Sequence, residues 1–188
     1  MMGLFEFLMI LLSVIIGLAL TELLTGVASL LRVRETVHFY WVHIGVQFGI
    51  FVALLQQWWE SWDLARIEVI SFGAVLLLIV PSLVLFLIAH MLFPRPAKDA
   101  NLEDYYYKQS PVIWGLVVLG TVEGTFIMPL VEQEPVFHAS NISGLPMIAL
   151  CVALAVSKNR KLHAVVAPLV LALVLLDTWL VNPIISSF

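Results

Sequence analysis

The first hydrophobic stretch of the chain, residues 4–31, reads LFEFLMILLSVIIGLALTELLTGVASLL and contains only two charged residues, Glu6 and Glu22. A helix needs about 20 mainly apolar residues to cross the hydrocarbon core of a bilayer. The N-terminus has no basic segment before this stretch and no obvious cleavage site after it, as a signal peptide would. We therefore predict a retained transmembrane helix.

The composition of the whole chain supports lipid as the solvent. Its 188 residues are 62% hydrophobic and 12% charged, with a mean hydropathy of +1.04. A soluble domain is about half apolar and about a quarter charged, and a core of this size could not hide so much apolar surface. The net charge of −4 argues against a nucleic-acid partner. The single cysteine, Cys151, excludes an intramolecular disulfide, and we expect it to serve in packing.

Hydrophobic runs of spanning length recur along the sequence with short polar segments between them. We predict an all-α, polytopic membrane protein that forms a six-helix bundle in one domain, residues 1–188. In the fifth run the segment HASNISGLP is typical of a loop, so we expect its regular helix to begin near Ser143. The six predicted spans are residues 4–31, 37–59, 69–94, 111–131, 136–157 and 162–182.

The basic residues predict the orientation of the bundle. Eight of the nine Lys and Arg residues fall in the first, third and fifth loops, and Arg66 alone falls in the second. The positive-inside rule assigns the basic side to the cytoplasm. We therefore expect both termini outside, and we expect the inner (plasma) membrane of a bacterium. The eight residues are Arg32, Arg34, Arg95, Lys98, Lys108, Lys158, Arg160 and Lys161.

Several ionisable residues lie inside the predicted spans, where they are costly and are functional candidates by default. Because the spans contain no Lys or Arg, we expect these acids to pair with histidines, water or an entering ion. Ordered by estimated depth, they form a hypothetical ladder for protons or cations. From the outer to the cytoplasmic side, its members are Asp177, Glu123, Glu22 with His43, and His90.

The outer end of the second span is also acidic and polar. The segment QQWWESWD contains Gln56, Glu60 and Asp63, which could form an outer vestibule that attracts cations. A solvated helix end explains the same residues equally well.

Small residues predict where helices pack closely. In the first span, Gly17, Thr21 and Thr25 follow one another at every fourth position, and residue steps of about 100° place Glu22 on the same side. In the fourth span, Gly120 and Gly124 form a GxxxG pair around Glu123. We therefore expect both glutamates to be buried in helix–helix seams.

Two aromatic clusters occur near the predicted ends of spans, where amphipathic rings favour the membrane interface. We predict that both belong to interfacial belts. The clusters are Tyr105, Tyr106 and Tyr107 on the cytoplasmic side, and Trp58, Trp59 and Trp62 on the outer side.

These patterns leave three classes of function open. We favour a small membrane protein that conducts protons or cations through the ladder, in contact with lipid and as an oligomer. The alternative is a non-transporting subunit that docks and stabilises a larger membrane complex through the same seams. The third is a haem- or quinone-binding redox subunit, because His38, His43, His90 and His163 lie near one leaflet.

We do not expect an enzyme. The sequence contains no phosphate-binding glycine loop, nucleophile elbow or metalloprotease helix. Neither a metal site nor a cofactor is predicted by ligand spacing, since no CxxCH or HExxH motif is present.

Overall fold

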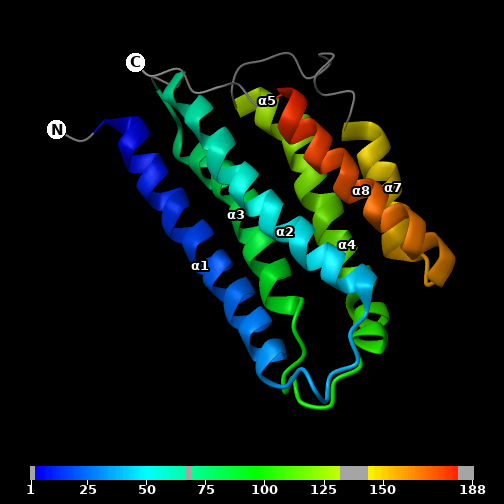
Figure 1. The fold of residues 1–188 in the computed structure, drawn as a ribbon. Helices are drawn as coiled ribbons and strands as arrows, with labels where there is room; N and C mark the ends of the chain where they lie inside the picture. The colour runs from blue at the N-terminus through cyan, green and yellow to red at the C-terminus, as the bar shows by residue number, and fades with distance from the viewer. Residues whose placement is uncertain (1–2, 67–68, 132–143, 182–188) are drawn as a thin grey trace.

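The computed structural model describes residues 3–66, 69–131 and 144–181, without the side chains of Arg66, Asp177, Thr178, Leu180 and Val181. Within these ranges the chain forms helices and loops and no strand, as the all-α prediction requires. The long helices alternate in direction (Figure 1). They are α1 (Leu4–Arg32), α2 (Trp41–Glu60), α3 (Phe72–Met91), α4 (Leu102–Val122), α7 (Gly144–Val156) and α8 (Arg160–Val181).

The helices form two layers (Figure 1). In one layer α1 packs along α3, α3 packs against α4, and α4 packs along α7. In the other layer α2 and α8 pack against each other and cross the first layer, with α2 also touching α1 and α3. The main core lies between the layers, and the described loop residues 33–40, 94–101 and 157–159 gather at one end of the bundle.

Among the described residues, three helical segments are long and apolar enough to cross a membrane: Leu4–Arg32, Phe72–Met91 and Leu102–Val131. Many large apolar side chains on the outside of the bundle are exposed, as expected of helices that face lipid. The described part of the fifth helix, α7, runs from Gly144, and the predicted start near Ser143 lies outside the described residues. Its 13 described residues rise about 20 Å, less than the roughly 30 Å of a hydrocarbon core.

The fourth helix begins nine residues before the predicted span, because its first turns are stabilised by polar residues. The Asn101 side chain accepts hydrogen bonds from the backbone N–H groups of Glu103 (2.9 Å) and Asp104 (3.3 Å). Both acids also lie in the first turn, where the helix dipole favours negative charge. Apolar run length therefore underestimates this helix, because its first two turns are polar.

The second helix begins later than predicted, because the residues before it pair with another loop. The His38 N–H donates to the Ala100 carbonyl (3.0 Å), and the Leu102 N–H donates to the His38 carbonyl (3.0 Å). The Asp99 N–H also donates to the Thr36 hydroxyl oxygen (3.2 Å). These bonds tie the α1–α2 connection to the α3–α4 connection.

The predicted packing face of the first helix is wrong. Gly17, Thr21 and Thr25 are exposed, and a Cβ atom added to Gly17 would meet nothing within 4 Å. The Thr21 hydroxyl donates to the Gly17 carbonyl within its own helix (2.8 Å), so it needs no partner helix. Larger side chains make more dispersion contacts when buried, and the buried face accordingly comprises Leu8, Leu12, Ile16, Ala19, Leu23, Gly26 and Leu30.

Of the two glycines in the predicted GxxxG pair of the fourth helix, one lies against a neighbouring helix and the other faces open space. A Cβ atom at Gly120 would lie 3.7 Å from Cγ1 of Val84, so this glycine faces α3 in ordinary contact. A Cβ atom at Gly124 would meet nothing within 4 Å.

Replacing Gly26 with Ala should destabilise the protein, because the added Cβ would collide with the Phe93 ring. We expect the free energy of unfolding to fall by about 1–3 kcal/mol, measured by reversible unfolding in detergent. The matched control is Gly17→Ala on the same helix, where the added Cβ would meet open space. This variant should be neutral, or more stable by a few tenths of a kcal/mol because alanine favours a helix more than glycine does. Equal stability of the two variants would contradict this packing.

Candidate functional site

The buried carboxyl group of Glu123 lies where the fourth helix changes its winding. After α4 the chain makes a π-helical turn, η2 (Glu123–Ile127), and continues as α5 (Met128–Val131). The Met128 N–H reaches back to the Glu123 carbonyl, five residues earlier. Such turns are rare and occur frequently at functional sites.

The local sequence favours this wider turn. Pro129 has no N–H to donate to the Thr125 carbonyl, so the α-helical pattern loses one bond there. The Thr125 hydroxyl donates to the Thr121 carbonyl (2.7 Å), and its side chain fills the space beside Gly144 of α7. Glu123 is 3% exposed, and its turn contacts α3 and α7. The predicted burial of this glutamate is therefore confirmed.

A second polar cluster lies at the opposite, basic end of the bundle and centres on Tyr106. The Trp114 Nε1–H donates to the Tyr106 hydroxyl oxygen (3.0 Å), which lies 2.7 Å from Nδ1 of His163. The His163 Nε2 lies 2.8 Å from the Ser157 carbonyl oxygen. Tyr106 and His163 are 0% exposed.

The groups at the two ends of this series of hydrogen bonds, the Trp114 indole and the Ser157 carbonyl, fix the direction in which each bond is donated. An indole N–H can only donate and a carbonyl can only accept. His163 therefore donates from Nε2 to Ser157, and its Nδ1 accepts from the Tyr106 hydroxyl. These hydrogen bonds join α4 to α8 and to the Ser157 carbonyl that precedes α8.

His43 lies beside this cluster and is also 0% exposed. Its Nε2 is 2.8 Å from the Leu92 carbonyl oxygen, to which it donates. Its ring packs edge-on against Tyr105 and Tyr106, with centroids 6.0 and 5.8 Å away. The Tyr105 hydroxyl donates to the carbonyl oxygens of Met91 (2.8 Å) and Phe93 (3.0 Å). The side chains of His43 and Tyr105 therefore both stabilise the end of α3.

The belt prediction is wrong for Tyr106, which is a core residue, and the other two tyrosines are only partly exposed. The Tyr107 hydroxyl lies 2.9 Å from that of Tyr40. The Arg160 guanidinium lies 6.0 Å from the Tyr107 ring centroid and forms an ion pair with Glu103 (3.2 Å). These contacts join α8 to α4, whereas a belt would face lipid.

Glu22 is not buried in a helix seam as predicted. Its carboxylate, with 30% of the side chain exposed, lies 2.7 Å from the Arg95 guanidinium and 3.3 Å from Nδ1 of His90. Pairing with a histidine was expected, but the arginine was not, because Arg95 follows the third run in the sequence. Arg95 lies shortly after the end of α3, which packs along α1, and its guanidinium donates to the Glu22 carboxylate there.

The described ladder residues fall in three separate places. Glu22 and His90 pair on the outer side of α1 and α3, His43 lies in the core, and Glu123 is buried in η2, which contacts α3 and α7. Within the described chain α1 and α4 do not pack on each other. The side chain of Asp177 lies outside the described part, although its backbone belongs to α8.

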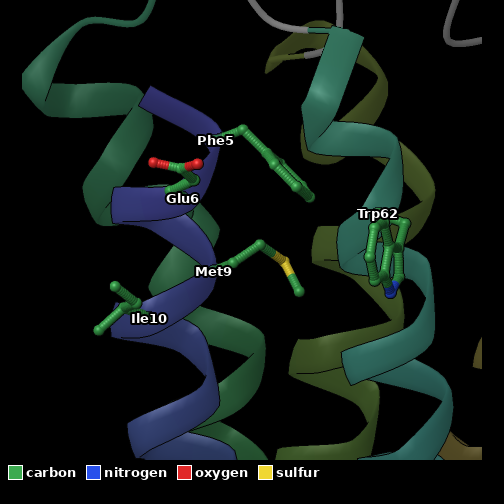
Figure 2. Close-up of a pocket in the computed structure, with 5 residues that line it drawn as sticks. All are labelled: Phe5, Glu6, Met9, Ile10 and Trp62. Atoms are coloured by element: carbon green, nitrogen blue, oxygen red, sulfur yellow. The ribbon is translucent and has the colours of Figure 1, made fainter. Parts of the chain in front are cut away.

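The predicted vestibule residues lie at the other end of the bundle. The Gln56 amide donates to the exposed Glu60 carboxylate (2.8 Å), and Asp63 is half-buried in the 3₁₀ helix η1 (Ser61–Arg66). Nearby, Phe5 and Met9 point toward Trp62 across a shallow groove, while Glu6 and Ile10 point away (Figure 2). The Glu6 carboxylate accepts a bond from the Gly3 N–H (3.0 Å), so it caps α1.

Sequence reasoning missed Tyr106, Trp114 and His163 as a unit. The buried positions Tyr106, Ser110, Ile113 and Trp114 follow the i, i+4, i+7, i+8 spacing of one helix face. That spacing was a usable signal for burial. The pairing with His163, 57 residues away, had no counterpart in the sequence.

No protein family model, curated protein or solved structure is significantly similar to this chain. Within the described ranges, no three His, Cys, Asp or Glu side chains gather as a metal-binding group. Both nitrogens of His163 and one of His43 are hydrogen-bonded, which disfavours these two residues as paired haem ligands.

Replacing Tyr106 with Phe should destabilise the protein, because Trp114 and His163 would each lose a buried hydrogen bond. We expect a loss of about 2–4 kcal/mol from two unsatisfied groups, measured by unfolding followed through tryptophan fluorescence. Tyr107→Phe is the matched control. It removes one half-buried hydroxyl contact and should cost about 1 kcal/mol or less. A larger cost for the control would contradict the central role of Tyr106.

Proposed function

We propose that this chain is a small integral membrane protein that moves protons or cations, with Glu123 as the residue that takes up the ion. The observation that carries the proposal is the burial of this carboxyl group in a π-helical turn of the apolar segment Leu102–Val131. Ionisable groups at membrane depth are costly and are retained chiefly for function.

The surroundings of Glu123 favour a proton or a cation over an anion. The sequence contains no Lys or Arg from residue 109 to residue 157, and α3 contains none either. In a low-dielectric setting a carboxyl group is stable as the neutral acid or beside a positive charge. A proton or a cation, and not an anion, is therefore the kind of ion that this carboxyl group could take up.

The proposed path is narrower than the ladder of five residues. Glu22 pairs with both His90 and Arg95 at the outside of the bundle, so we omit Glu22 and His90 from the path. His43 and Asp177 stay in the proposal as candidates on the basic and the opposite side of Glu123. We further propose that the basic end faces the cytoplasm of a bacterial inner membrane.

The test is ion flux in proteoliposomes that contain the purified protein. We expect an imposed proton or alkali-cation gradient to drive flux through the wild type. Glu123→Gln preserves the size of the side chain but cannot ionise, so its flux should fall to the leak of protein-free liposomes.

Glu22→Gln is the matched control, because it makes the same chemical change at a carboxylate outside the proposed path. We expect this variant to retain wild-type flux. Wild-type flux in Glu123→Gln would refute the role of Glu123, and an absence of flux in the wild type would refute transport.

The competing function is that of a membrane subunit that docks onto another protein or a second copy of itself. It is favoured by one observation, the row Gly17, Thr21 and Thr25 on α1, which is exposed in the described structure and has open space at Gly17. Small residues of this spacing allow close approach of a neighbouring helix.

If α1 docks through this row, Gly17→Leu should weaken self-association or the recovery of a partner protein. Gly115→Leu on α4 is the matched control, since that glycine is also exposed and has nothing within 4 Å of an added Cβ. The oligomer mass is measured by light scattering in detergent, and partners are identified by cross-linking in the native membrane. Identical behaviour of the two variants would exclude this row as a docking surface.

A further inference from the structure

A small cavity of about 250 Å³ lies where α1 ends, between the α1–α2 and α3–α4 connections. It is lined by Arg32 and the turn residues 33–36 on one side and by Lys98 on the other. No part of the proposed transport site contributes to it. Three of the six residues that line it carry cationic side chains.

The backbone around this cavity is held by hydrogen bonds. The Thr36 N–H donates to the Val33 carbonyl (2.9 Å), and the Thr36 hydroxyl accepts from the Asp99 N–H (3.2 Å). The paired segments at His38 and Ala100 continue this connection. Lys98 is therefore held beside the turn that follows α1.

The charge of the cavity is positive. Arg32, Arg34 and Lys98 are set against one carboxylate, that of Glu35. In the described part of the chain, none of the three cations forms an ion pair, whereas Arg95 and Arg160 pair with Glu22 and Glu103. The C-terminal end of a helix dipole also favours cations, which supports Arg32 and Arg34 at this position.

The location of the cavity indicates what it can bind. It lies at the basic end of the bundle, at the end of a helix that is long and apolar enough to cross a membrane. Guanidinium and ammonium groups recognise phosphate oxygens through charge-assisted hydrogen bonds. Basic pockets beside transmembrane helices are positions at which anionic headgroups bind.

We propose that the cavity formed by Arg32, Arg34, Thr36 and Lys98 binds a phosphate group, supplied by the headgroup of an anionic phospholipid or by free phosphate. The two sources share the chemistry of recognition. Binding at this cavity does not depend on transport through Glu123.

The test is binding of two probes to the purified full-length protein in a zwitterionic detergent. Phosphatidylglycerol and phosphatidylcholine are titrated separately and followed by native mass spectrometry, and inorganic phosphate is titrated with the unfolding temperature as the readout. We expect at least one phosphate probe to bind: phosphatidylglycerol about tenfold more tightly than phosphatidylcholine, or inorganic phosphate with a rise in unfolding temperature.

The pocket variant Arg34→Gln/Lys98→Gln should lose this binding. The control variant Lys108→Gln/Lys158→Gln removes the same charge from exposed positions at the same end and should keep it. The single variant Arg34→Gln replaces the double variant if the latter does not fold, and it should weaken binding in the same direction.

The pattern across the probes assigns the source. Preference for phosphatidylglycerol without an effect of inorganic phosphate supports a lipid headgroup, and an effect of inorganic phosphate that the pocket variant abolishes supports free phosphate. Equal losses in the pocket and control variants would overturn the proposal, because they indicate a diffuse field. No binding of either probe to the wild type would overturn it as well.

Discussion

The hydroxyl group of Tyr106 is the point on which the packing of the basic end depends. It accepts from Trp114 in its own helix and donates to His163 on α8, while its ring contacts His43 on α2. In the hydrocarbon region of a membrane, no water is present to form a hydrogen bond with an unsatisfied polar group. Three helices therefore have to meet in one arrangement for all these groups to be bonded.

This constraint separates two kinds of buried polar residue in the protein. At the basic end, Tyr105 and His163 are bonded in fixed directions to carbonyl oxygens, and they hold helix ends together. In the fourth helix, Glu123 is buried at a π-helical turn, away from that cluster. A titratable acid at an irregular turn is the arrangement expected of a functional group, whereas the locked network is the arrangement expected of a scaffold.

The candidate site was predictable only in part. Burial of Glu123 followed from its apolar run and the neighbouring glycines, and the structure agrees. The arrangement of the ladder residues could not be predicted from the sequence, because the depth of a residue along a helix does not determine the direction in which its side chain points. Glu22 illustrates the error, since a loop that follows α3 brings Arg95 to it across 73 residues of sequence. Tyr106 illustrates the opposite error, a residue assigned to the interface that the fold buries.

Composition and run length were sufficient for the all-helical, membrane-type character of the chain, because both depend on the solvent that the side chains tolerate. Only the tertiary structure decided which face of α1 is buried, which acid is paired with a cation, and which aromatic residues form the core. These outcomes depend on helix rotation and on contacts between residues far apart in the sequence, and neither is encoded in the hydropathy of a single segment.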